Sequence, residues 1–226
     1  MYKLLLLDAD GTIFDFDKAE EYALQSSLEY FKYHGDFIEL KKKYKIINSG
    51  LWHELELGNI SKNELREERF RRLFTIYKLD FNIKDFSDIY LQFLSKGSYL
   101  IDGAVDICKY LSSKYKLVIL TNGIKEVQLS RLEGSVIKDY ISDIIISEEA
   151  GVNKPDPYIF EYSFNKIKHS CKSDVMIIGD SLTSDIQGGN NFGIDSCWLN
   201  LNNITNKTTA LPTYSINSLA ELKELL

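Results

Sequence analysis

The sequence is poor in cysteine and has no excess of positive charge, and each shortage excludes a class of protein. The three cysteines, Cys108, Cys171 and Cys197, are odd in number and widely spaced, which indicates neither a disulfide framework nor a metal site. We expect free thiols in a reducing compartment. The formal charge of −6 leaves no broad basic surface, so a nucleic acid polymer is not an expected partner.

Long apolar segments, internal repeats and low-complexity tracts are also missing. The apolar run Leu4–Leu7 stops at Asp8 and is too short for a membrane span or a secretion leader. We therefore expect a cytoplasmic protein that is not bound to a membrane. The 226 residues, of which 44% are hydrophobic, are enough for one domain with a large insertion or for two small domains.

Two patterns of hydrophobicity divide the chain. From about residue 16 to 94, apolar residues recur every three or four positions, which predicts helices, and Ser61 and Glu64 are spaced as a capping box. From about residue 100, short β-branched runs alternate with helical segments, which predicts a parallel sheet. The strands expected after Leu4–Leu7 are residues 116–120, 144–146, 175–178 and 196–199.

These patterns predict an α/β fold, with a doubly wound parallel-sheet core and an all-helical insertion. Residues 1–15 and 98–226 would form the core, and residues 16–97 would form the helical module inserted after the first strand. An insertion at that point would lie over the carboxyl ends of the strands. Open α/β sheets carry their chemistry at those ends.

The first strand leads directly into the sequence DADGTIFD, residues 8–15. It places two carboxylates, Asp8 and Asp10, two residues apart and follows them with a glycine and a hydroxyl. This set suits a site that combines a nucleophile, a proton shuttle and an oxygen-ligated metal. The alternative interpretation is a strand that ends in an acidic turn.

Three later strand ends carry polar residues that fit the first. Thr121-Asn122-Gly123 stands between a strand and a helix, where backbone N–H groups favour an anion, although the same triplet is also common in turns. Lys154 follows the next strand and would bring an ammonium, or be ordinary solvated surface. Asp180 and Asp185 follow the fourth strand as an acidic pair, unless Asp185 is only a first-turn helix acid.

The four strand-end motifs resemble, in their order along the chain, those of the haloacid dehalogenase (HAD) superfamily, in its phosphatase branch. They are Asp-x-Asp-Gly-Thr, Thr-Asn-Gly, Lys-Pro and Gly-Asp with a second Asp. The helical insertion stands where the C1-type cap of that superfamily belongs. The resemblance covers essentially the whole chain. It implies a Rossmann-like core that hydrolyses small phosphorylated metabolites.

Specific roles are implied by the same resemblance. Asp8 matches the nucleophile that attacks phosphorus and becomes an aspartyl phosphate. Asp10 matches the general acid that protonates the leaving oxygen, and then the base that activates water. The implied phosphate-binding residues are Thr121, Asn122, Gly123 and Lys154.

A Mg²⁺ cofactor is implied as well. Asp180 matches a ligand of that ion, together with the Asp8 carboxylate and the Asp10 backbone carbonyl. Asp185 matches a second acid that supports either the metal or Lys154. Magnesium prefers oxygen ligands, so these groups suit it chemically.

A narrower resemblance is to the bacterial pyrimidine 5′-nucleotidases of this superfamily, which implies nucleoside monophosphates as substrates. Open alternatives are a sugar-phosphate phosphatase or a phosphomutase. A haloacid dehalogenase is disfavoured because such enzymes typically lack the acid at Asp10, and an inactive binding protein is disfavoured by the intact acidic set. The strings that carry this resemblance are Leu51-Trp52, Arg69-Phe70, TNG at 121–123, ISEEAGVNKPD at 146–156, SDIQGG at 184–189 and CWLN at 197–200.

Four residues near or within the insertion are candidates for contact with the substrate. Phe14, Phe16 and Trp52 would stack on a base, and Arg69 would reach a base or sugar. The alternative for each aromatic ring is packing in a core, and the alternative for Arg69 is a solvated helix face. A monomer or a homodimer is expected.

Overall fold

The computed structural model describes residues 1–226, and the chain divides into two compact units. We call residues 1–16 with 98–226 the sheet unit, and residues 17–97 the helical unit. The division differs by one residue from the sequence-based boundary, because Phe16 is grouped with the sheet unit although it begins helix α1.

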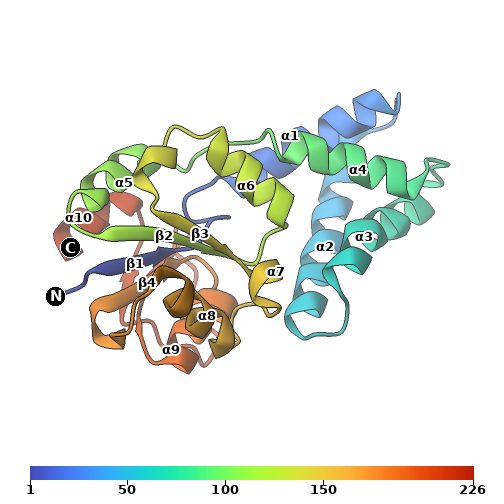
Figure 1. The fold of residues 1–226 in the computed structure, drawn as a ribbon. Coiled ribbons are helices and arrows are strands. Elements are labelled where there is room, and N and C mark those ends of the chain that lie inside the picture. The colour runs from blue at the N-terminus through green and yellow to red at the C-terminus, as the bar shows by residue number, and fades with distance from the viewer. The chain divides into compact units, whose positions relative to one another are not determined.

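The sheet unit is built on a parallel sheet whose strand order is β3-β2-β1-β4-β5-β6 (Figure 1). Strand β1 lies in the interior of this sheet and pairs with β2 and β4, which follow it by more than a hundred residues. The fold prediction of a doubly wound parallel sheet is confirmed, but strand β6 was not predicted, because it is short and lies at an edge. The bounds are β1 Leu4–Leu7, β2 Lys116–Thr121, β3 Asp143–Ile146, β4 Val175–Gly179, β5 Asp195–Leu199 and β6 Tyr214–Ile216.

Strand β1 consists of four leucines because both faces of the sheet are covered at this position. Leu5 and Leu7 belong to the core on one face, and Leu4 and Leu6 belong to the core on the other. All four side chains are buried, as expected for a strand inside a parallel sheet. The next residue, Asp8, is therefore held at a fixed place at the carboxyl edge.

Helices cover both faces of the sheet (Figure 1). Residues of α5 and α10 pack into the core on one face, and residues of α8 and α9 pack into the core on the other. A π-helical turn, Leu182–Ile186, precedes α9. The helices of this unit are α5 Ala104–Ser112, α6 Lys125–Glu133, α7 Ser147–Ala150, α8 Pro157–Ile167, α9 Gln187–Phe192 and α10 Leu222–Leu225.

The helical unit contains α1 Phe16–Tyr30, α2 Phe37–Glu56, α3 Lys62–Tyr77 and α4 Ile83–Leu94. Asp36, Ser61 and Asn82 cap the starts of α2, α3 and α4 by accepting hydrogen bonds from backbone N–H groups. The predicted capping box is confirmed, because Glu64 accepts a hydrogen bond from the Ser61 backbone in return. None of these helices has the length and apolar composition of a membrane span.

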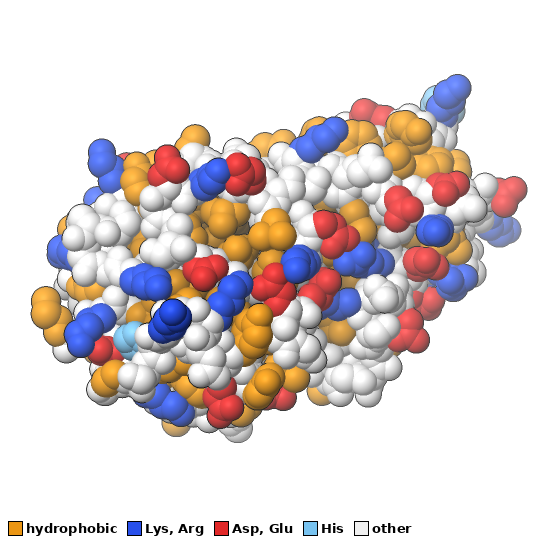
Figure 2. All heavy atoms as spheres, in the orientation of Figure 1, with side chains coloured by type: hydrophobic (Ala, Val, Ile, Leu, Met, Phe, Trp, Pro, Cys, Tyr) orange, Lys and Arg blue, Asp and Glu red, His pale blue; other side chains and the backbone are white.

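Charged side chains of both signs are interspersed over the face of the molecule drawn in Figure 2. Many of them pair along one helix, as Lys42 does with Glu39 and Arg72 with Glu68. Such exposed pairs contribute little to stability, because water and salt screen their attraction. This surface is consistent with the mixed composition and small net charge of the chain.

The interior of the helical unit holds a polar cluster among aromatic rings. Asn48 donates a hydrogen bond of 2.7 Å to the buried carboxylate of Glu20. The buried guanidinium of Arg69 lies 4.6 Å from the ring centre of Tyr90. Burial raises the pKa of Glu20 to about 7, against the opposing effects of Lys45, Asn48 and Arg69.

This raised pKa predicts that the free energy of unfolding falls as the pH rises. Glu20 has an ordinary value of 4.5, so the unfolded chain loses this proton first and the folded chain keeps it up to about pH 7. The loss of stability over that window is on the order of 3 kcal/mol, at about 1.36 kcal/mol per pH unit. We expect the free energy of unfolding, measured with urea, to decrease between pH 5 and pH 8. The decrease should be smaller for Glu20→Gln than for the wild type.

The exposed Glu29 on the same helix provides the matched control. In Glu29→Gln, the free energy of unfolding should decrease between pH 5 and pH 8 by the same amount as in the wild type. An equal decrease in the wild type and in Glu20→Gln would contradict the assignment to Glu20.

Candidate active site

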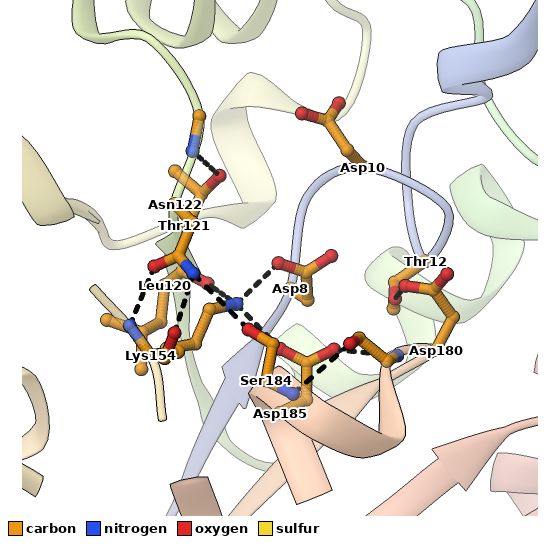
Figure 3. A network of polar contacts seen from close by, with 12 residues as sticks. Asp8, Asp10, Thr12, Leu120, Thr121, Asn122, Lys154, Asp180, Ser184 and Asp185 are labelled. Carbon is orange, nitrogen blue, oxygen red and sulfur yellow. Dashed lines mark hydrogen bonds and ion pairs between the residues drawn. The ribbon is translucent and has the colours of Figure 1, made fainter. Parts of the chain in front are cut away.

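The carboxyl edge of the sheet brings together side chains from strands far apart in the sequence (Figure 3). Leu7 is in register with Ile119 of β2 and Ile178 of β4, so the residues that follow these positions meet at one edge. The predicted site residues that converge there are Asp8, Thr121, Asn122, Lys154, Asp180 and Asp185.

Lys154 lies at the centre of this edge. Its side chain is 1% exposed, and its Nζ donates to Asp8 Oδ1 at 2.5 Å, Asp185 Oδ1 at 2.6 Å and the Leu120 carbonyl at 2.7 Å. These three bonds use all three protons of the ammonium. Burial alone would lower the pKa of Lys154, but the Asp185 and Asp8 carboxylates outweigh it and raise that pKa overall. The solvated-surface interpretation of Lys154 is therefore wrong.

Asp8 is poised between opposing influences. Burial raises its pKa well above the ordinary value; the Lys154 ammonium opposes that shift, while Asp185 and Asp180 add to it. A nucleophilic carboxylate has to be ionised, so any further cation beside Asp8 would favour the reactive form.

Asp8, Asp180 and Asp185 form an acidic cluster in which one carboxylate oxygen of each lies within 4.8 Å of the others. Although Asp180 keeps contact with solvent, crowding by protein atoms and then the charge of Asp185 raise its pKa to about 7. Three carboxylates and the single ammonium of Lys154 sum to a charge of −2 when all are ionised. An all-oxygen donor set with this charge fits one divalent cation of the Mg²⁺ type.

The two acids that follow β4 are engaged differently. Asp185 Oδ1 accepts from Lys154, and its Oδ2 accepts from the Ser181 backbone N–H at 3.0 Å, so both oxygens are already used by the protein. This geometry favours the support of Lys154 over direct ligation of a metal, the two roles that the sequence left open. The Asp180 side chain is exposed and accepts a hydrogen bond from the Thr12 hydroxyl at 3.2 Å, so it is the better placed ligand.

Gly11 permits the close approach of the first motif to Asp180. Its φ of +86° lies in the left-handed region, and a Cβ at this position would stand 2.5 Å from Asp180 Oδ2. Thr12, the hydroxyl of the first motif, received no role of its own from the sequence; it follows directly and donates a hydrogen bond to the same carboxylate. The glycine and the hydroxyl of DADGT thus both serve Asp180.

The Thr-Asn-Gly triplet divides into two functions. Thr121 Oγ1 accepts from the Gly123 N–H at 2.9 Å, which shapes the turn after β2. Asn122 binds the backbone of Lys154 twice, donating to its carbonyl at 2.9 Å and accepting from its N–H at 2.8 Å. Its amide also donates to Ser184 at 3.3 Å. Asn122 therefore holds the lysine loop, a role that the phosphate-binding prediction did not include.

Asp10 does not join the acidic cluster, because its side chain points away from Asp8 (Figure 3). It accepts a hydrogen bond from Gln128 Nε2 at 2.6 Å and forms an ion pair with Arg131. Neither of these helix α6 residues was singled out from the sequence. Their only local signal is the spacing of three residues, which places them on one helix face.

The four candidates for substrate contact have different surroundings. Phe14 is buried in the sheet-unit core beneath the guanidinium of Arg131, which favours its alternative, packing in a core, over stacking on a base. Arg69 is buried among aromatic rings, which contradicts the solvated-face alternative. Phe16 and Trp52 are half-buried, and Trp52 packs against the Leu51, Leu55 and Leu65 cluster.

Comparison with known proteins gives full-length similarity. A family model described as haloacid dehalogenase-like hydrolase matches residues 5–199. The pyrimidine 5′-nucleotidase PynA of Streptococcus pneumoniae is 39% identical over 228 residues, covering 100% of this chain and 95% of that protein. The pyrimidine 5′-nucleotidase YjjG of Escherichia coli is 30% identical over 229 residues, covering 98% and 96%.

A solved structure is similar over the same length. The HAD-hydrolase YfnB of Bacillus subtilis is 38% identical over 227 residues, which cover 100% of this chain and 95% of that protein. Its crystal structure, which has magnesium bound, matches with a TM-score of 0.93 over 100% of this chain and 98% of that one.

The acidic cluster predicts that Mg²⁺ stabilises the folded protein. A ligand at ten times its dissociation constant adds about 1.4 kcal/mol, which for a chain of this size raises the melting temperature by roughly 3–6 °C. Asp180→Asn should abolish this rise, whereas the exposed Asp139→Asn should retain it. Thermal unfolding with and without MgCl₂ provides the measurement, and an unchanged Mg²⁺ shift in Asp180→Asn would exclude Asp180 as a ligand.

Lys154→Met should be strongly destabilising, because it leaves buried carboxylates without their cation. The expected loss at pH 7 is about 3–5 kcal/mol of unfolding free energy. The loss should shrink at acid pH, since burial raises the pKa of Asp8 and protonation removes the uncompensated charge. Denaturant unfolding should show no comparable loss for the exposed control Lys138→Met. A loss for Lys154→Met no larger than that of the control would contradict the central role of this ammonium.

Proposed function

The chain belongs to the haloacid dehalogenase-like hydrolase family, and on that premise we propose that it is a Mg²⁺-dependent phosphomonoesterase that acts through an aspartyl phosphate. The observation that supports this most directly is the buried Lys154 ammonium bound to Asp8 beside the open carboxylate of Asp180. A phosphoryl group approaching Asp8 would meet one fixed cation from the protein. The acidic cluster suits a second.

In the proposed first step, an Asp8 carboxylate oxygen attacks phosphorus and the bond between phosphorus and the ester oxygen breaks. Asp10 gives its proton to the departing oxygen, which leaves as an alcohol. In the second step, water attacks the aspartyl phosphate, Asp10 takes a proton from that water, and inorganic phosphate leaves the restored Asp8 carboxylate. Each step moves one proton through Asp10, and the two steps together return the site to its starting state.

The charged groups of the site support such a transfer. The transition state spreads negative charge over the equatorial phosphoryl oxygens, so catalysis depends on positioning and on cations. Lys154 is held in place by three hydrogen bonds and needs no rearrangement to serve as one of these cations. Mg²⁺, held by Asp8, Asp180 and the Asp10 carbonyl, would supply the other and would neutralise phosphoryl charge.

We propose nucleoside 5′-monophosphates with a pyrimidine base as the preferred substrates. Two full-length relatives carry the name pyrimidine 5′-nucleotidase, which favours this class over sugar phosphates. Of the aromatic candidates for stacking on a base, Phe16 and Trp52 retain partial exposure. A haloacid dehalogenase attacks carbon and expels halide, which needs no proton, so that reaction would not use the acid at Asp10.

Phosphate release from a panel of substrates tests this proposal. UMP, dUMP and dTMP should be hydrolysed more than about tenfold faster than glucose 6-phosphate at equal concentration, in the presence of Mg²⁺. One methylene or one hydroxyl is worth 10–200-fold in a fitted pocket, so a nucleotide pocket should exceed this threshold. Comparable rates would instead indicate a general sugar-phosphate phosphatase.

The nucleophile is tested separately. Asp8→Asn replaces the attacking oxygen with a group of almost equal volume, so turnover should fall to background while the fold is retained. The exposed Asp139→Asn should keep wild-type turnover. Substantial turnover by Asp8→Asn would refute the aspartyl-phosphate mechanism.

A further inference from the structure

Asp10 is held by two residues that the proposed reaction does not otherwise use. Gln128 Nε2 donates to Asp10 Oδ2 at 2.6 Å, and Arg131 Nη1 pairs with Asp10 Oδ1. Both oxygens of the carboxylate are thus engaged by neighbouring turns of helix α6. Gln128 and Arg131 are 1% and 0% exposed, so they form a buried, fixed support rather than a surface contact.

Arg131 is itself tied to the two chain segments that connect the units. Its guanidinium lies 4.6 Å from the ring centre of Phe14, on the segment that leaves the sheet unit. Its backbone carbonyl accepts a hydrogen bond of 2.9 Å from Ser98, on the segment that returns. These contacts hold Arg131 from two sides, so its position beside Asp10 is set by the surrounding backbone.

The two connecting segments are also joined to each other. Ile101 N–H donates to the Ile13 carbonyl at 3.0 Å, and Asp15 N–H donates to the Tyr99 carbonyl at 3.0 Å. A bridge between Phe14 and Leu100 lies between these two bonds. Arg131 therefore rests on a hydrogen-bonded backbone pair, which limits its freedom to move.

Gln128 reaches Asp10 through space that a different neighbour leaves open. A Cβ at Gly123 would lie 2.1 Å from Gln128 Nε2, so the two atoms would overlap. The missing side chain at Gly123 thus leaves the space in which the amide reaches Asp10. This is an independent reason for glycine in the Thr-Asn-Gly triplet, and it connects the second motif to the first.

We propose that Gln128 and Arg131 are positioning residues that orient the Asp10 carboxyl group for proton transfer to the leaving oxygen. The inference rests on the proposed function, because it assumes that Asp10 is the acid of a phosphoryl transfer. A carboxyl group without these partners would rotate among several orientations, and a displacement of about 1 Å in a reacting group costs on the order of a hundredfold in rate. The pair therefore acts through Asp10 and touches no substrate.

The leaving group of the substrate separates positioning from a merely structural role. UMP releases a strongly basic alkoxide that needs the proton of Asp10, whereas 4-nitrophenyl phosphate releases a weakly basic phenolate that leaves without it. The ratio kcat/KM covers the steps up to the departure of this group, so it does not include the later action of Asp10 on water. Loss of the oriented acid should consequently affect UMP and spare the aryl ester.

Gln128→Leu and Arg131→Met remove the donors while keeping similar volumes. Each should lower kcat/KM for UMP by roughly 10–100-fold and for 4-nitrophenyl phosphate by less than about threefold, following the pattern of Asp10→Asn. Arg131→Lys, which keeps the charge, should recover part of the loss. The exposed Ser130→Ala on the same helix should match the wild type with both substrates.

The outcomes distinguish this inference from the function on which it rests. An equal loss with both esters, or no loss with either, in a folded Gln128→Leu variant would overturn the positioning role. Turnover by Asp8→Asn, no turnover by the wild type, or the absence of a split in Asp10→Asn would instead overturn the proposed function. Because Arg131 is completely buried, circular dichroism of each variant must match the wild type, and Gln128→Leu decides the question if Arg131→Met does not fold.

Discussion

The buried ammonium of Lys154 is the interaction on which the rest of the site depends. It donates hydrogen bonds to the Asp8 and Asp185 carboxylates, and the Leu120 carbonyl accepts its third hydrogen bond. Buried ion pairs contribute little net stability, since desolvation offsets most of the Coulomb attraction. This ion pair instead fixes the position of the ammonium, because all three of its N–H groups are hydrogen-bonded. Asn122 then anchors the backbone that carries it.

The parallel sheet converts this local chemistry into a common site. Because β1 lies between β2 and β4 in matched register, the residues after three strands arrive at one edge, although β2 and β4 follow β1 by more than a hundred residues. Both faces of β1 are buried, so a shift in its register would carry a flanking charged residue, Lys3 or Asp8, into the apolar interior. The precision of the acidic cluster therefore comes from the hydrophobic core beneath it.

Two carboxylates that are neighbours in sequence have contrasting surroundings. Asp8 lies in the acidic cluster and depends on cations for its ionised form. Asp10 follows after the chain has turned, and it faces the amide of Gln128 and the guanidinium of Arg131. The two carboxylates therefore occupy separate places and have separate partners, which suits a division of tasks between them.

The sequence by itself determined the strands, the helical insertion and the strand-end positions of Asp8, Thr121 and Asp180, because short buried runs and helical periodicity are local properties. Only the tertiary structure decided that Lys154 is central and that Asp185 supports it. It also decided the burial of Phe14, the partners of Asp10 and the existence of strand β6. Burial and hydrogen-bond partners depend on which distant segments cover a residue, and no local pattern records that.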